Sequence, residues 1–72
     1  MKELLLSNSF KLVSNCSCGG TYRETYAKNR SASIQIEIMP IKKTFRLIIN
    51  GKREKVLSET LFEQTMKEYE LI

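Results

Sequence analysis

The dipeptide Asn50-Gly51 is the feature that most constrains the fold of this chain. It separates the largely apolar segment Thr44–Ile49 from the segment Lys52–Leu57. Asn-Gly is a preferred pair for a two-residue type I′ turn, because both central residues of that turn need a positive φ. The sequence therefore predicts an antiparallel β-hairpin centred on these two residues.

A further strand is predicted immediately before the hairpin. The segment Ser33–Met39 alternates apolar and polar residues with a period of two, which places Ile34, Ile36 and Ile38 on one face. Pro40 then ends the strand, because proline has no N–H group to donate to a sheet.

The first half of the chain has weaker patterns. Phe10–Val13 is expected to form a strand, and Thr21–Tyr26 is expected to form another. The glycine-containing segment Cys16–Gly20 would be the turn between them, and Ala27–Ser31 would be the loop that leads to the next strand.

The C-terminal segment Ser58–Glu70 changes to a helical period. Ser58 and Thr60 are rival N-caps, and Glu63 and Lys67 form an i,i+4 pair in the favourable order. One apolar stripe is expected to cover the sheet and consists of Leu61, Phe62, Thr65, Met66 and Tyr69.

These elements predict one small α+β domain over residues 1–72. Three to five antiparallel strands would form a meander, and the C-terminal amphipathic helix would pack on one face of it. A chain of this length buries only about 60% of its unfolded surface, so self-association would help to stabilise the fold.

Composition argues against an enzyme. All eight acidic residues are glutamate, and histidine is absent. The commonest general base and the usual partner of a cysteine nucleophile are therefore missing.

The short run Leu4–Leu6 is too brief for a signal peptide, and no segment approaches the length of a membrane span. We expect a cytoplasmic protein with reduced cysteines and no membrane partner.

Charge is distributed unevenly along the chain. Ile41–Val56 carries six basic residues and one acid, whereas Ser58–Ile72 carries four glutamates and one lysine. A two-residue turn would place Arg53 opposite Ile48 and Lys55 opposite Arg46, so that the basic side chains share the solvent face while Phe45, Leu47 and Val56 face the core. The predicted nucleic-acid-binding residues are Lys42, Arg46, Arg53 and Lys55.

Two observations leave that prediction open. Basic residues on the outer face of a hairpin also protect a sheet edge from aggregation and keep a protein soluble. Tyr22 and Tyr26 lie on the same side of their strand, where they can stack on bases or, more commonly, pack into the core.

Cys16-Ser-Cys18-Gly19-Gly20 resembles half of a zinc knuckle. One residue separates the cysteines, where two to four are usual, and the chain has no third cysteine. A zinc site would need Cys16 and Cys18 from two chains, or glutamate ligands. The alternatives are a redox pair or, as we favour, two small apolar side chains beside a tight glycine turn that binds no cofactor.

We therefore expect a small non-enzymatic binding module, with nucleic acid as the leading partner. The alternative is a protein-interaction or structural subunit, such as a homodimer, which would use the C-terminal helix or the Leu4–Leu6 run. No small-molecule substrate is implied.

Overall fold

The computed structural model describes residues 1–72 apart from the side chain of Cys18. The helix α1 (Lys2–Ser7) comes first, and the chain ends with the helix α2 (Phe62–Glu68). Between them lie six strands: β1 (Lys11–Cys16), β2 (Arg23–Ala27), β3 (Ile34–Met39), β4 (Thr44–Ile49), β5 (Lys52–Arg53) and β6 (Leu57–Ser58). Two 3₁₀ helices complete the fold: η1 (Cys18–Gly20) and η2 (Glu59–Leu61).

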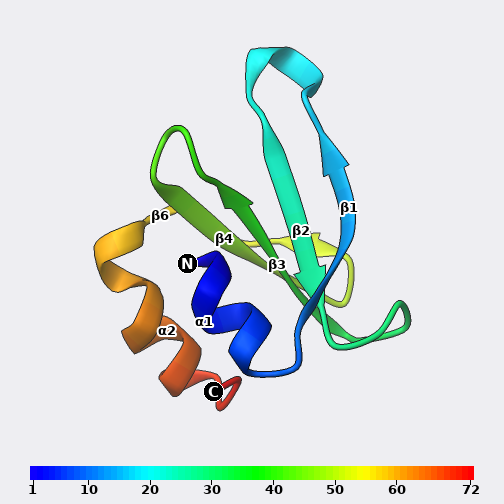
Figure 1. The fold of residues 1–72 in the computed structure, drawn as a ribbon, viewed down its shortest axis with the longest axis vertical. Coiled ribbons are helices and arrows are strands. Elements are labelled where there is room, and N and C mark those ends of the chain that lie inside the picture. Colours follow the sequence, from blue (N-terminus) through cyan, green and yellow to red (C-terminus); the bar gives the residue numbers. More distant parts are fainter.

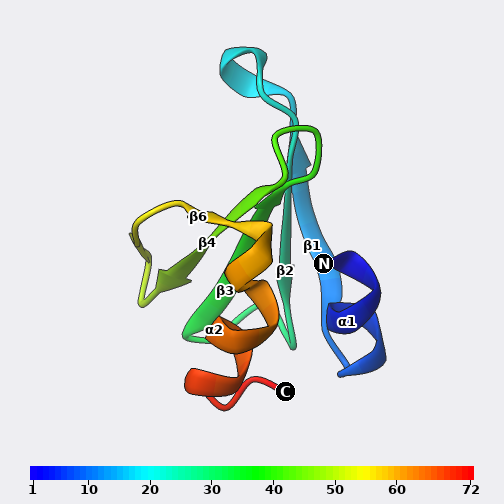
Figure 2. The ribbon, with the colours of Figure 1, turned by 90° about the vertical axis from the view of Figure 1, so that its left-hand side faces the viewer.

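The strands form one antiparallel sheet in the order β1-β2-β3-β4-β5, with β6 also paired to β4 (Figure 1). This arrangement confirms the predicted α+β meander with a C-terminal helix. The turn between β1 and β2 projects beyond the rest of the sheet, as both views show (Figure 2).

The Asn50-Gly51 hairpin has the predicted geometry. Asn50 has a φ of 53° and Gly51 a φ of 80°, the positive values that a type I′ turn requires. Ile49 is opposite Lys52 and Ile48 is opposite Arg53, which is the predicted register.

Beyond this turn the predicted strand is wrong, because the returning chain leaves the ladder. Strand β5 ends at Arg53, although Glu54 N still donates to Leu47 O over 2.8 Å. When pairing resumes, Leu57 is opposite Phe45, and the register has slipped by one residue. The extra residue is a bulge, which removes the expected pairing of Lys55 with Arg46.

The same bulge changes the environment of Val56. We predicted that this side chain faces the core, but it is 44% exposed. Phe45 and Leu47, which precede the turn, are buried as expected.

The N-terminal half contains one element that the sequence patterns did not predict. Residues Lys2–Ser7 form α1, which has no side-chain N-cap and buries Leu5 completely. Ser9 has a φ of 70°, and Phe10 N donates to Leu5 O over 3.0 Å, so the chain turns sharply from the helix into β1. Because so short a helix carries too few residues to show a period, only tertiary packing defines it.

Both helices cover the same face of the sheet, and the core lies between them and the strands (Figure 2). Phe45 of β4 meets Phe62 of α2 edge to face, with ring centroids 5.0 Å apart. The buried core cluster is Leu5, Phe10, Tyr26, Ile36, Ile38, Phe45, Leu47, Phe62 and Met66.

The C-terminal helix is shorter than predicted. Ser58 caps η2 by accepting a hydrogen bond from Thr60 N over 3.4 Å, and α2 begins three residues later than η2. The Lys67 Nζ atom lies 3.0 Å from Glu63 Oε2, which confirms the expected i,i+4 pair.

Candidate nucleic-acid interface

The strands have a second face, which we call the open face, whose side chains point away from the core. Successive residues of a strand point to opposite faces, so the neighbours of the core residues gather here. The open face includes Ser14, Arg23, Thr25, Gln35, Glu37, Arg46, Ile48 and Arg53, and by the same register the buried Ala27 and Met39.

Strand register aligns these residues in rows across the sheet. In one row, Thr25 is opposite both Ser14 and Glu37, and Glu37 is opposite Arg46. In the adjacent row, Ile48 is opposite both Gln35 and Arg53.

An ion pair lies in the middle of the open face. The Arg46 Nε atom donates to Glu37 Oε1 over 2.7 Å. Glu37 is only 4% exposed, and the Arg46 side chain is 18% exposed. A carboxylate this deeply buried needs a charged partner, so the first role of Arg46 is to neutralise Glu37.

Two adjoining hollows lie on the open face and share Ser14, Thr25, Glu37 and Arg53. The smaller has a volume of about 170 Å³ and also includes Asn15, Cys16 and Arg23. The larger has a volume of about 290 Å³ and extends to Val13, Arg30, Gln35 and Ile48. We refer to the two together as the trough.

The trough is positively charged. Arg23, Arg30 and Arg53 line it, and none of the three forms an ion pair with a residue that the structure describes. The single acid in its wall, Glu37, is already paired with Arg46.

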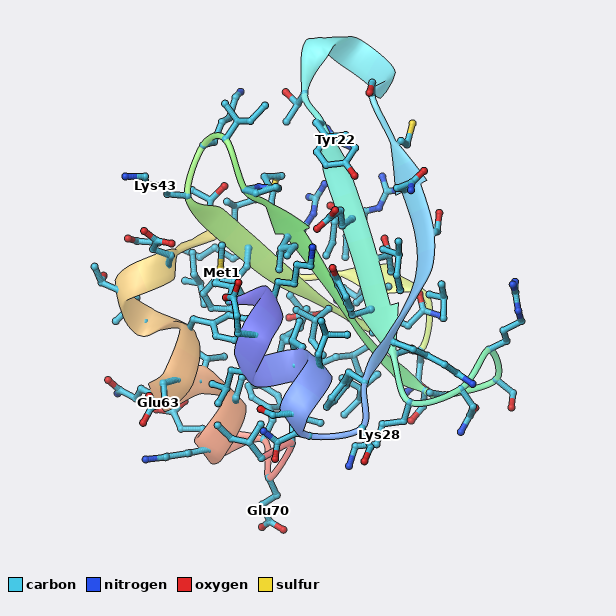
Figure 3. The ribbon with its side chains drawn as sticks, in the orientation of Figure 1. Met1, Tyr22, Lys28, Lys43, Glu63 and Glu70 are labelled. Carbon is cyan, nitrogen blue, oxygen red and sulfur yellow. The ribbon has the colours of Figure 1, made fainter. Side chains whose placement is uncertain are left out.

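The four predicted binding residues are not brought together. Arg46 and Arg53 share the open face, but Lys42 lies exposed in the turn between β3 and β4. Lys55 lines a separate groove beside α2, together with Glu68 and Tyr69. Figure 3 shows Lys43, the neighbour of Lys42, in the β3–β4 turn and Glu63 on α2.

Sequence reasoning missed the contribution of the first half of the chain. Arg23 and Arg30 line the trough, yet neither lies in the basic hairpin. One signal was present: Glu37 interrupts an isoleucine-rich strand, and a tight turn at Pro40 would place it opposite Arg46. An acid and a base directly opposite each other on neighbouring strands indicate a cross-strand ion pair.

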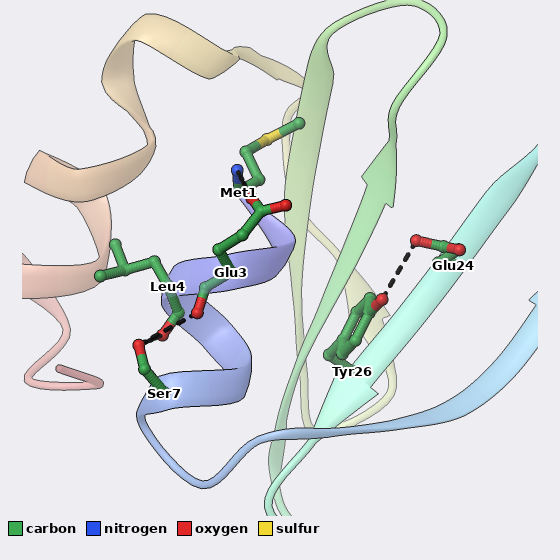
Figure 4. Close-up of polar contacts among 6 residues, drawn as sticks. All are labelled: Met1, Glu3, Leu4, Ser7, Glu24 and Tyr26. Carbon is green, nitrogen blue, oxygen red and sulfur yellow. Dashed lines mark hydrogen bonds and ion pairs between the residues drawn. The ribbon is translucent and has the colours of Figure 1, made fainter.

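The two tyrosines lie on the helix-covered side of β2. Tyr26 is 1% exposed and belongs to the core. Its Oη atom donates to Glu24 Oε1 over 3.1 Å (Figure 4), and Tyr22 Oη donates to Glu24 Oε2 over 2.8 Å. Burial, followed by this hydrogen bond, raises the pKa of Tyr26 to about 12. The hydrogen bond to Glu24 also raises the pKa of Tyr22. Packing is therefore the role of Tyr26.

The cysteine turn is described only in part. Cys16 ends β1, lines the smaller hollow and is disulfide-bonded, which differs from the reduced thiol expected from the sequence. The side chain of Cys18 lies outside the described part, so the predicted zinc pair stays a prediction. Gly19 and Gly20 have φ values of 67° and 78°, as a tight glycine turn requires. Among the described residues, no three histidine, cysteine or acidic side chains cluster as a metal site.

Comparisons with known proteins do not add to these observations. No protein-family model matches the chain, and neither the curated proteins nor the solved structures include a match. No helix of the described residues is long and apolar enough to cross a membrane.

Proposed function

We propose that the protein binds nucleic acid through the trough on its open face. The observation that carries this proposal is the set of three arginines, Arg23, Arg30 and Arg53, around a carboxylate that is already neutralised. Arginine presents a planar fork of N–H donors that matches the oxygens of a phosphate group. Arginines spaced along a groove provide successive contacts to a phosphate backbone.

The shape of the site favours a single strand. Part of the positive charge is recessed, since Arg23 is half-buried and lines the smaller hollow. A flexible single strand can lower a phosphate group into such a hollow, whereas the phosphates of a duplex are held on a rigid outer surface. Binding of this kind tolerates many sequences and weakens with salt.

The test compares two charge reversals in the same hairpin. Arg53→Glu and Lys55→Glu change the net charge equally, but only Arg53 lines the trough. Fluorescence anisotropy with labelled oligothymidine and oligouridine would measure affinity over a series of salt concentrations. We expect Arg53→Glu to weaken binding at least about tenfold and to reduce the salt slope by about 0.7 for each phosphate that the variant no longer neutralises.

Lys55→Glu is the matched control. It should leave affinity within about threefold of the original protein, because its only effect is long-range and screened by salt. Equal losses in the two variants would show that only net charge matters, and the trough would not be the interface. Absence of binding by the original protein at low salt would refute the proposal.

Self-association is a second candidate function, and one observation favours it. Leu61 and Tyr69 belong to the predicted helical stripe but are 41% and 43% exposed, whereas Phe62 and Met66 of the same stripe are buried. A Leu61→Glu variant should convert a dimer into a folded monomer in analytical ultracentrifugation. A monomeric original protein at high concentration would count against this function.

A further inference from the structure

Arg23 is the most unusual residue of the trough. Its Nε atom is inaccessible to solvent and is the one buried side-chain nitrogen or oxygen among the described residues that has no hydrogen-bond partner. Buried donors are nearly always paired, because a donor that is removed from water without a new partner destabilises the fold. A partner that arrives from outside the chain would recover this free energy.

The surroundings of Arg23 define the chemistry of that partner. Besides Arg23, the smaller hollow is lined by Arg53 and by the hydroxyl side chains of Ser14 and Thr25. Neither hydroxyl forms a hydrogen bond within the part of the chain that the structure describes. Two guanidinium groups and two hydroxyl groups offer many donors to one small volume, which suits an anion with several acceptor oxygens.

Glu37 is the one group in this wall that would repel an anion. Its Oε1 atom is held by Arg46 at 2.7 Å, and this charge-assisted bond directs the carboxylate toward β4. Because Arg46 neutralises Glu37, the charges of Arg23 and Arg53 are not compensated, and the hollow carries two positive charges.

We propose that the smaller hollow is a phosphate subsite in which Arg23 is the anchoring residue and Arg53, Ser14 and Thr25 complete the set of donors. This inference rests on the proposed function, since the phosphate is one of those in a bound strand. Because the Nε–H group of Arg23 is covered in the free protein, its side chain must turn toward the phosphate on binding. That rotation pairs a donor that is unpaired before binding.

The turning of Arg23 gives a direct spectroscopic readout. In ¹⁵N-labelled protein, the Nε–Hε signal of Arg23 should shift and saturate as inorganic phosphate is added at constant ionic strength, with chloride as the comparison anion. Arg23→Lys keeps the charge but removes the planar fork, and we expect it to weaken phosphate binding about tenfold. The matched control is Lys55→Arg, a charge-conserving exchange outside the trough, which should bind phosphate as the original protein does.

The outcomes separate this inference from the proposed function. If oligonucleotides bind but phosphate does not move the Arg23 signal, or if Arg23→Lys and Lys55→Arg bind phosphate equally well, the subsite is wrong and the trough survives as an interface. If phosphate saturates the Arg23 signal but no oligonucleotide binds or competes, the subsite serves a free oxoanion and the proposed function is wrong. Competition between oligonucleotide and phosphate for the Arg23 signal supports both.

Discussion

The two faces of the sheet are built from the same strands but are buried by different means. On the helix-covered face, Ile36, Ile38 and Phe45 are at most 1% exposed and belong to a core that includes apolar side chains of both helices. Glu37 lies between those isoleucines in sequence but on the open face. It is 4% exposed, and its buried carboxylate forms an ion pair with Arg46 instead of packing against apolar side chains. Alternation along β3 therefore separates the apolar core from a face on which the charged Glu37 is almost as deeply buried, next to Met39, which is 5% exposed.

The difference indicates which face provides stability and which is available for binding. Apolar burial stabilises by about 25 cal/mol for each Å² removed from water. A buried ion pair contributes little net stability, because desolvation of both charges offsets their attraction. The open face thus contributes less to folding than an apolar face of equal burial would, which is consistent with a binding role.

The largest expected effect comes from truncating the helix-covered face. Phe45 is fully buried and contacts Phe62 edge to face, so Phe45→Ala should lower the free energy of unfolding by about 3–5 kcal/mol. Ile48 lies on the same strand but on the open face and is half-buried, so Ile48→Ala should cost only about 1 kcal/mol. Urea unfolding followed by circular dichroism measures both.

A domain of this length has a total stability of roughly 4–11 kcal/mol, so Phe45→Ala can leave too little folded protein to measure. Phe45→Leu is then the milder variant, and it should still lower the free energy of unfolding more than Ile48→Ala does. Equal losses of unfolding free energy in the Phe45 and Ile48 variants would contradict the assignment of the two faces.

A second experiment tests the polar burial of the open face. Arg46→Met removes the partner of Glu37 and leaves an almost fully buried carboxylate alone, so we expect a loss of about 2–4 kcal/mol. The double variant Glu37→Leu with Arg46→Met replaces both charges with apolar groups and should return to within about 1 kcal/mol of the original protein.

The double-mutant cycle has a clear opposite outcome. If the double variant is less stable than the original protein by clearly more than about 1 kcal/mol, the ion pair is a net source of stability and the two faces are more alike than we argue. Urea midpoints for the two single variants and the double variant decide between these results.

Local signals account for most of the fold that could be predicted. Asn50-Gly51 determined one hairpin, and the alternation of Ser33–Met39 identified the strand at the centre of the sheet. Both features depend on neighbouring residues alone. The helix α1 and the bulge before Leu57 were missed, because each depends on contacts between segments distant in sequence.

The candidate site was harder to predict for the same reason. The hairpin accounts for Arg46 and Arg53, but Arg23 reaches the trough only through pairing of β2 with β1 and β3. Charge counted along the sequence grouped Lys55 with Arg53, although the bulge separates them. Net charge in a segment thus did not reveal which cations share a surface.

The smallest expected effect concerns the alkaline stability of the helix-covered face. Tyr26 in the folded protein keeps its proton up to a pKa of about 12, whereas a tyrosine in an unfolded chain loses it near pH 10. Between these values the unfolded state binds fewer protons, so the stability that Tyr26 confers is complete below about pH 10. It is lost as the pH rises toward 12, by about 2–3 kcal/mol in total.

Tyr26→Phe isolates this effect. The lysines and the other tyrosines are present in both proteins, so their contributions to the pH dependence cancel when the two are compared. Urea unfolding at about pH 9 and about pH 11 should show the stability difference between the original protein and the variant changing by about 1 kcal/mol, with the original protein losing more. A difference that stays constant with pH would mean that Tyr26 ionises as readily in the folded protein as in the unfolded chain. The burial of its hydroxyl group against Glu24 would then not hold in solution.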